Sequence, residues 1–241
     1  MNENFPVAGA PFLFLDAAGR LPVTGVWRDG TWLAFHRAEN PAASETLFAL
    51  IDATLADAKL RPTKLGKDSE RSELGGLGGF IFAEGPGSVL GIRIAAIALR
   101  SWLALPEFAG KPVFAFGSLT LAAHLLLRNS PDRRDFSLLA DSRLGRWNTL
   151  AVRNSVVPET FSEMSATELA VLPQPRFRIT QRALGEPPSP WEPFPENLLE
   201  RDPATLAVPN LMHTTNAPDA ANTPAQYAKW APLRHRAEER G

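Results

Sequence analysis

Two short apolar runs, at residues 80–83 and 113–116, are each followed by a segment with helical periodicity. The first run leads into a helix expected over residues 88–105, and the second into a helix expected over 118–127. Strands that alternate with helices need crossover connections, and these place successive strands parallel in one sheet. The alternation therefore predicts an α/β fold built on a partly parallel sheet.

Antiparallel strand pairs are expected on either side of that region. Residues 12–17, 22–28 and 31–37 form three apolar runs, and the last two are joined by an Asp-Gly pair, which is a strong hairpin signal. Residues 136–140 and 146–152 predict a further strand pair. The parallel strands should therefore lie between a meander and a hairpin along the chain.

The composition changes after Pro158, because thirteen of the chain's 22 prolines lie from there onward. Proline lacks a backbone N–H group and makes poor helices and poor central strands. We expect ordered pieces at residues 166–172, at residues 176–184 and near Tyr227. The rest of this region should wrap over the surface or be disordered.

The overall composition excludes several classes of protein. With a formal net charge of −1 over 241 residues, the chain as a whole is not a basic nucleic-acid binder. The absence of cysteine removes disulfides, thiolate metal sites and a cysteine nucleophile. No signal-peptide pattern is visible, and the apolar stretches are too short for a membrane span. We expect a soluble, cytoplasmic protein without membrane association.

The stretch Gly85-Pro86-Gly87-Ser88 stands where the first of the parallel strands turns into its helix. Two glycines allow a sharp turn, Ser88 can cap the helix, and free N–H groups at a helix start can hold a phosphate. The Lys-Ser/Thr ending of a P-loop is missing. A phosphate contact and a plain strand-to-helix turn are both compatible with the stretch, and helix starts far outnumber phosphate sites.

Two carboxylates are candidate site residues because each follows a predicted strand. Asp16 ends the first strand and Asp141 ends a later one, so the two could frame a cleft, although such residues more often cap turns. The four histidines include no pair spaced i, i+4, and no Gly-x-Ser-x-Gly elbow occurs. The sequence therefore predicts no metal site.

Apolar side chains follow one face of a helix that Ser44 is expected to cap, and small residues follow one side of the helix after Ser88. The residues concerned are Leu47, Ile51 and Leu55 on the first helix and Gly91, Ala95 and Ala98 on the second. For the small residues of the second helix, packing in the core and contact with another subunit are equally good explanations.

The run Gly85-Pro-Gly-Ser-Val-Leu-Gly-Ile-Arg-Ile94 closely resembles the Gly-Pro-Gly-Ser-Phe-Thr-Gly-Leu-Arg-Ile signature of the TsaB proteins, also called YeaZ. Shorter matches follow in the family's order: Phe14-Leu-Asp16, Ser44-Glu45, Phe116-Gly-Ser-Leu119, Asp141-Ser-Arg143 and Pro224-Ala-Gln-Tyr227. The resemblance is good over residues 12–153 and weak beyond them. Departures from the family argue against a nucleotide contact by this chain: Ala17-Ala18 for Thr-Ser, Ala43 for His and Leu90 for Thr.

The resemblance implies an α/β fold of the actin/Hsp70/sugar-kinase-like (ribonuclease H-like) class. It implies two lobes, residues 1–117 and a reduced, divergent lobe at residues 118–241. It also implies a non-catalytic subunit that pairs with the catalytic subunit TsaD. With TsaE and a threonylcarbamoyl-adenylate synthase, the pair attaches the threonylcarbamoyl group to the adenosine beside the anticodon of tRNAs that read ANN codons.

Partners and site residues follow from the same resemblance. tRNA would be reached through the complex, and no firmly bound cofactor is expected; a nucleotide at the TsaD junction and a homodimer of the isolated chain stay open. The residues expected at the TsaD interface are Leu47, Phe48, Ile51, Leu55, Gly91, Ile94, Ala95 and Ala98. The motif residues expected at a phosphate contact are Gly85, Pro86, Gly87, Ser88 and Arg93.

Two enzymatic hypotheses compete with this one. An ATP-dependent transferase or kinase of the same fold would use Asp16 and the turn at Gly85. A glycoprotease would need a metal site or a nucleophile constellation that the sequence does not provide.

Overall fold

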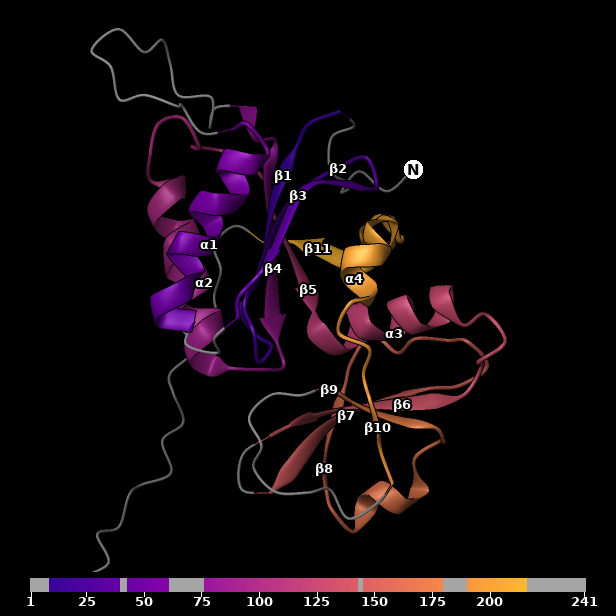
Figure 1. Cartoon of the computed structure of the whole chain (residues 1–241). Coiled ribbons are helices and arrows are strands. Elements are labelled where there is room, and N and C mark those ends of the chain that lie inside the picture. The colour runs from indigo at the N-terminus through magenta and orange to yellow at the C-terminus, as the bar shows by residue number, and fades with distance from the viewer. Residues whose placement is uncertain (1–8, 40–42, 61–75, 143–144, 180–189, 216–241) are drawn as a thin grey trace, which may run out of the picture.

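The computed structural model describes residues 9–39, 43–60, 76–142, 145–179 and 190–215. These residues form two mixed sheets, with helices on both sides of the first sheet and the second sheet beyond its end (Figure 1). The predicted α/β class is confirmed.

The first sheet has six strands in the order β11-β5-β4-β1-β2-β3. Its strands are β1 (Phe12–Asp16), β2 (Val23–Arg28), β3 (Thr31–Arg37), β4 (Gly79–Gly85), β5 (Val113–Gly117) and β11 (Met212–Thr214). Strands β1, β4 and β5 run parallel, while β2, β3 and β11 join antiparallel. The parallel centre and the antiparallel opening are both confirmed.

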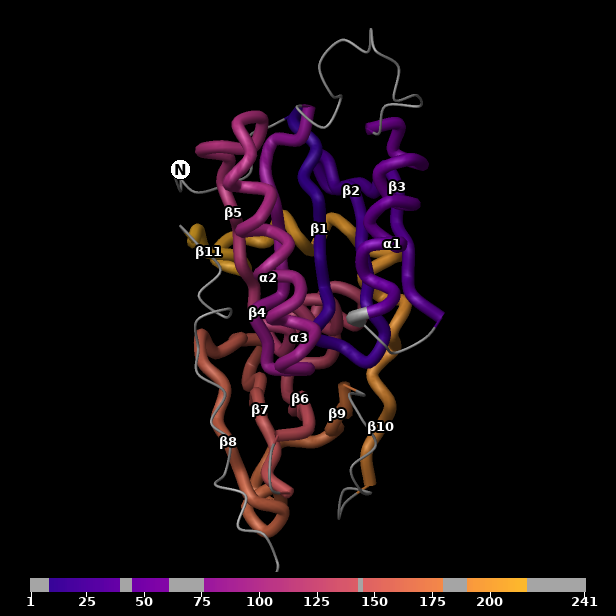
Figure 2. The backbone as a smooth tube through the Cα atoms, turned by 90° about the vertical axis from the view of Figure 1, so that its left-hand side faces the viewer, coloured from indigo at the N-terminus to yellow at the C-terminus, as the bar shows by residue number. Residues whose placement is uncertain are grey.

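Helices α1 (Ala43–Asp57) and α2 (Val89–Leu103) cover one face of this sheet, and α3 (Ser118–Asn129) lies on the other (Figures 1 and 2). The strand residues alternate accordingly: Leu13 packs toward α1 and α2, and Phe14 packs toward α3. Helix α1 begins at Ala43, one residue before the predicted cap Ser44.

The second sheet has five strands in the order β10-β9-β6-β7-β8. Its strands are β6 (Phe136–Asp141), β7 (Arg146–Val152), β8 (Ser162–Ser165), β9 (Arg176–Ile179) and β10 (Glu192–Pro193), with the short helix η2 (Glu168–Val171) before β9. Phe136 and Phe177 join Phe116 of the first sheet and Leu121 of α3 in one core. The two sheets therefore share a continuous apolar interior.

The segment after β10 returns to the first sheet. It forms α4 (Leu198–Arg201), η3 (Pro203–Ala207) and β11, and its side chains Leu198, Leu199, Leu206 and Leu211 are buried. This region was expected to wrap over the surface or be disordered, and residues 190–215 are ordered. The apolar residues between these prolines are numerous enough to pack, and tertiary contact outweighs weak local propensity. Tyr227 lies outside the described residues.

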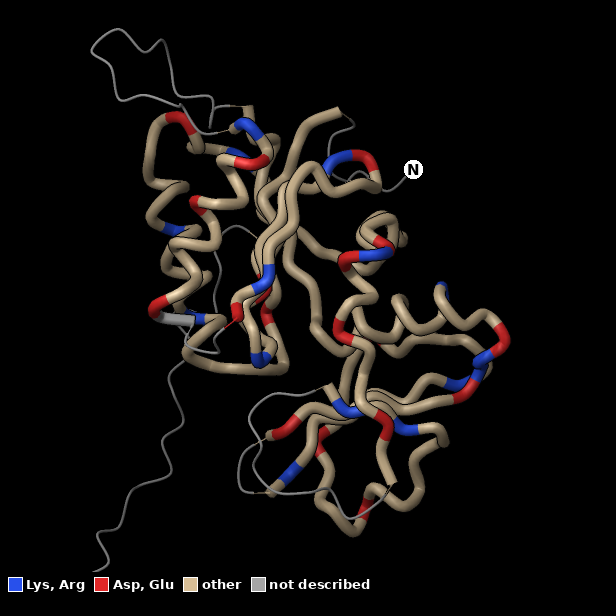
Figure 3. The backbone as a smooth tube through the Cα atoms, in the orientation of Figure 1, with Lys and Arg blue, Asp and Glu red and all other residues tan. Residues whose placement is uncertain are grey.

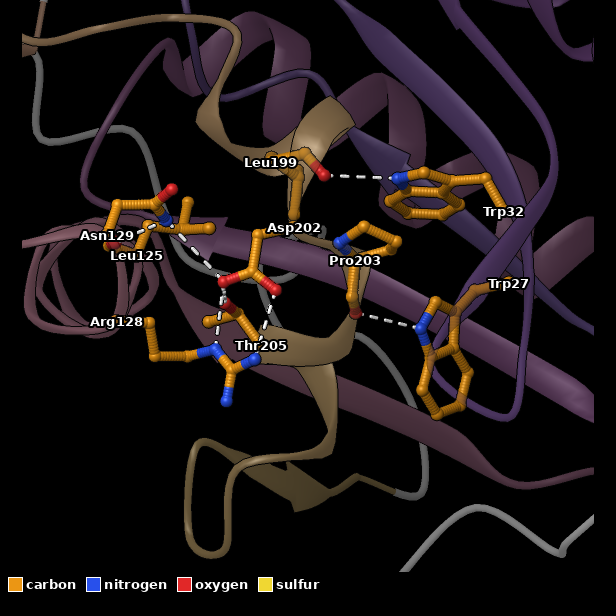
Figure 4. A network of polar contacts seen from close by, with 9 residues as sticks. All are labelled: Trp27, Trp32, Leu125, Arg128, Asn129, Leu199, Asp202, Pro203 and Thr205. Atoms are coloured by element: carbon orange, nitrogen blue, oxygen red, sulfur yellow. Dashed lines mark hydrogen bonds and ion pairs between the residues drawn. The ribbon is translucent and has the colours of Figure 1, made fainter.

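Polar contacts hold this returning segment in place (Figure 4). Trp27 Nε1 donates to the carbonyl of Pro203 at 2.9 Å, and Trp32 Nε1 donates to the carbonyl of Leu199 at 3.0 Å. On α3, the Arg128 guanidinium donates to the Asp202 carboxylate at 2.8 and 3.1 Å. The segment is thus bonded to strands β2 and β3 on one side and to α3 on the other.

The division into lobes at residues 117 and 118 stays a prediction. The chain does pass from β5 directly into α3 at that point, but β11, which the division assigns to the second lobe, pairs with β5 of the first sheet. Within the described part of the chain, no helix combines the length and the apolar character that crossing a membrane requires.

Candidate functional site

The Gly85–Ser88 turn packs against the turn that follows β1. Ser88 N donates to the carbonyl of Ala18 at 2.8 Å. A Cβ atom added at Gly91 would lie 1.9 Å from the carbonyl oxygen of Ala17, and one added at Gly87 would lie 2.3 Å from that of Ala18. Glycine is therefore required at both positions because another backbone segment approaches too closely for a side chain.

Two N–H groups at the start of α2 are already engaged within the chain. Ser88 caps the helix by accepting a hydrogen bond from Gly91 N at 3.2 Å, while its own N–H group is used by Ala18. Pro86 and Arg93 are partly buried beside this junction. These contacts favour the structural interpretation of the turn over the phosphate contact.

A cavity of about 110 Å³ lies on the α3 side of the first sheet, at the carboxyl end of β1. Its walls come from the turn after β1, from β2, β3, α3 and β9, and from residues 194–199 of the returning segment. Asp16, Arg37 and Ser118 contribute polar groups to it. Ligands of open α/β sheets commonly bind at the carboxyl ends of parallel strands, which makes this cavity the leading candidate site.

Asp16 carries the charge on the sheet side of the cavity. Its Oδ1 accepts a hydrogen bond from Ala18 N at 2.9 Å. Burial raises the pKa of the carboxyl, while the backbone groups of Ala18 and Gly19 and the charge of Arg37 oppose the rise. The carboxylate is therefore incompletely solvated where it borders the cavity.

The second predicted carboxylate is not part of this site. Asp141 pairs with Arg178 at 3.0 Å in the second sheet and is not among the residues that line the cavity. Burial raises its pKa, and the hydrogen bond and charge of Arg178 oppose the rise. The structure therefore does not bring Asp16 and Asp141 together around one cleft.

Most residues predicted for a partner interface lie inside the chain's own core. Leu47, Ile51, Leu55, Gly91, Ala95 and Ala98 are buried, and Ile94 is partly buried. Phe48, by contrast, exposes 52% of its surface. The exposed large apolar residues on the neighbouring helix are Val89, Leu90 and Ile97, none of which was predicted for the interface. Periodicity finds the apolar face of a helix but not the side chains that remain uncovered.

Several lining residues of the cavity also escaped prediction. Ser118 directly follows β5, which runs parallel to β4 and β1 in the first sheet. Its position at the end of a parallel strand could therefore have been recognised from the sequence. Phe194 and Leu199 come from the proline-rich part of the chain. No local pattern places that segment against β3, so no sequence signal identifies them.

Within the described residues, no three His, Asp or Glu side chains gather closely enough to hold a metal ion. The expectation that the chain carries no metal stays a prediction, because these residues are only part of it.

No family model and no curated protein matches the sequence. Among solved structures, YeaZ from Pseudomonas aeruginosa matches 70% of this chain and 75% of its own, with a TM-score of 0.52 and 18% identity. An uncharacterized protein with similarity to peptidase YeaZ from Pseudomonas aeruginosa matches 79% of this chain and 89% of its own, with a TM-score of 0.53 and 18% identity. At 18% identity, the comparison shows similarity of fold alone. The chain therefore has the fold of YeaZ, as the resemblance of its sequence predicted.

Proposed function

We propose that the chain is a TsaB-type partner subunit that docks and activates a TsaD-type catalytic subunit in threonylcarbamoylation of tRNA. The observation that carries the proposal is a row of uncovered apolar side chains on the helices that flank the first sheet. Leu90 and Ile97 of α2 are exposed by 62% and 56%, and Phe48 of α1 by 52%. Neighbouring exposed apolar residues of this size are typical of protein interfaces.

The spacing along α2 gathers these side chains on one side. Leu90, Ile94 and Ile97 stand at i, i+4 and i+7, which lie within one helical face. Helix α1 packs beside α2 (Figure 2), and the two helices form the outer layer on this face of the sheet. Phe48 is exposed on α1. A partner helix laid on this layer would bury these four side chains without disturbing the core beneath them.

The charge distribution supports a role in which the assembled complex, and not this chain alone, binds tRNA. Basic and acidic residues are interspersed around both sheets in the described part of the chain (Figure 3). Affinity for a phosphate backbone needs clustered Lys and Arg, and the net charge of the chain is −1. We therefore assign tRNA contact to the assembled complex with TsaD and TsaE, and expect any nucleotide to bind at the TsaD junction.

Aspartate substitutions on the outer layer test the proposal. Leu90→Asp and Ile97→Asp should each reduce co-purification with the TsaD of the same organism at least tenfold, because an unpaired carboxylate would be buried in an apolar contact. Val171→Asp is the matched control, since Val171 is 72% exposed on η2, remote from the two helices. Ile51→Asp is unsuitable, because Ile51 is only 2% exposed and the variant would disturb the core.

Unchanged pairing of both variants, measured by gel filtration and by calorimetry, would reject this interface. An assay of tRNA threonylcarbamoylation with and without the chain then tests the role itself. We expect tRNA threonylcarbamoylation to require this chain and to fail with the Ile97→Asp variant.

A kinase or transferase is the second candidate, and the cavity beside Asp16 is the observation that favours it. That hypothesis requires magnesium-dependent nucleotide binding by the isolated chain. A titration of the chain with ATP and magnesium separates the two candidates. We expect no binding, because the turn after β1 is Ala17-Ala18 and lacks the hydroxyl groups that would help to hold a phosphate.

A further inference from the structure

The cavity beside Asp16 lies on the opposite face of the first sheet from the proposed docking helices. Its character is mainly apolar: Leu121 and Leu125 come from α3, Ile179 from β9, and Phe194 and Leu199 from the returning segment. A volume of about 110 Å³ admits a compact body of a few carbon atoms. The apolar walls favour an aliphatic group over a sugar or a phosphate.

Two polar groups of the cavity lining remain available to a ligand. Asp16 borders it with a carboxylate that burial has deprived of part of its solvation. The hydroxyl of Ser118 is buried and has no hydrogen-bond partner among the described residues. Both groups can accept a hydrogen bond, and the carboxylate can only accept when it is ionised. A ligand head that donates several hydrogen bonds matches them.

The remaining charges at the cavity are already engaged or lie in solvent. Arg37 pairs with the Glu196 carboxylate at 3.3 Å and also donates to the main-chain carbonyl of Glu196. Arg20 is exposed at the rim, where water screens its charge. The positive end of α3 favours an anion, yet it faces a site that already contains the Asp16 carboxylate. Among the described residues, Asp16 is therefore the acidic group of the lining that forms no ion pair, although the charge of Arg37 acts on it.

We infer that this cavity binds a small primary amine with a compact aliphatic body, whose ammonium group lies between Asp16 and Ser118. An ammonium group carries three N–H donors and a positive charge, so it can form a charge-assisted hydrogen bond with the partly desolvated Asp16 carboxylate. Its aliphatic body replaces water against Leu121, Leu125 and Leu199. The site is independent of the proposed docking role, because it needs no partner protein.

Three probes of nearly equal size separate recognition of charge from recognition of shape. Isobutylamine, isobutanol and isobutyrate are titrated into the full chain at pH 7.5 and followed by protein chemical shifts. A dissociation constant on the order of 1–10 mM is expected for the amine, in keeping with about five heavy atoms. The alcohol should bind at least fivefold more weakly and the carboxylate should not bind.

Variants locate the binding. Asp16→Asn keeps the shape of the side chain and should weaken amine binding at least tenfold while leaving the weak binding of the alcohol unchanged. Ala122→Val narrows the cavity from α3 and should weaken both ligands. Asp57→Asn removes a carboxylate that pairs with His36 at 2.9 Å on the other face, and it should bind the amine as the original chain does. Circular dichroism verifies that each variant is folded.

Equal affinity for amine and alcohol, tighter binding of the carboxylate, or no binding of the amine would each overturn the inference. An unchanged amine affinity in Asp16→Asn would overturn it as well. None of these outcomes bears on docking to TsaD, which is measured with the exposed residues of α1 and α2, so the two proposals fail separately.

Discussion

Gly91 of α2 is in contact with the turn after β1, and it offers a direct test of how this motif works. Because an added Cβ would lie 1.9 Å from the carbonyl oxygen of Ala17, the Gly91→Ala variant must move one backbone segment away from the other. We expect a loss of about 3 kcal/mol in the free energy of unfolding, typical of severe overpacking and larger than the ~1 kcal/mol gained in helix propensity. Urea unfolding followed by circular dichroism measures it.

Gly19→Ala is the matched control on the facing turn. The nearest atom to its added Cβ would be the carbonyl oxygen of Leu21 at 3.8 Å, an ordinary contact distance. This variant should unfold at nearly the same urea concentration as the original chain. If Gly91→Ala were equally stable, the close packing of the two turns would not explain the glycines of the motif.

At the scale of single residues, the polar residue of the candidate site was easier to predict than the exposure of apolar side chains. Asp16 was found because it ends an apolar run, and the structure places it at a cavity. The interface residues Leu47 and Ile51 were chosen from the same periodicity that puts them into the core. A periodic pattern identifies which side of a helix is apolar, but a second element decides whether that side stays exposed.

At the scale of elements, the returning segment depends on its contact with α3. Asp202 accepts hydrogen bonds from Arg128 and, at 2.9 Å, from the Thr205 hydroxyl. The hydrogen bond from Arg128 is the main cause that lowers the pKa of Asp202 below the ordinary 3.8, although burial opposes it. Asp202→Asn should therefore lower the free energy of unfolding at pH 7 by about 1–2 kcal/mol, allowing for the partial exposure of Arg128.

The pH dependence of that difference has a definite sign. A carboxyl whose folded-state pKa is depressed stabilises the fold above its unfolded value of 3.8, and this contribution is lost as the pH falls through the folded-state pKa. The gap between Asp202→Asn and the original chain should close below pH 3.8. Glu163→Gln, which alters the exposed pair with Arg146, serves as the control and should change stability little. A gap that persists undiminished in acid would contradict the ionic origin.

The elements that the sequence predicted well are those with strong local patterns. The hairpin of β2 and β3 has its Asp-Gly turn, and α2 has its glycine turn and Ser88 cap. Strand β11 has only three residues and follows a proline-rich stretch, so pairing with β5 and not local preference defines it. The same holds for the cavity, whose outer wall is built by residues more than 150 positions after Asp16.

At the scale of the whole molecule, the two sheets should unfold as one unit. Apolar residues of both sheets, of α3 and of the returning segment belong to a single continuous core. The chain also leaves the first sheet at α3 and comes back to it at β11, so neither sheet can separate without breaking buried contacts of the other. Domains joined this extensively are expected to lose their structure in one cooperative step.

Tryptophan fluorescence measures this prediction, because the two regions carry separate tryptophans. One variant keeps Trp27 and Trp32 beside the returning segment, and the other keeps the stacked pair Trp147 and Trp191 on the second sheet; the remaining tryptophans are replaced by phenylalanine. Circular dichroism of each variant gives its own global midpoint, which corrects for any loss of stability from the replacements. In both, the fluorescence midpoint in urea should coincide with that global midpoint. Separate midpoints in either variant would mean that one sheet unfolds before the other and that the core between them does not hold the molecule together as one cooperative unit.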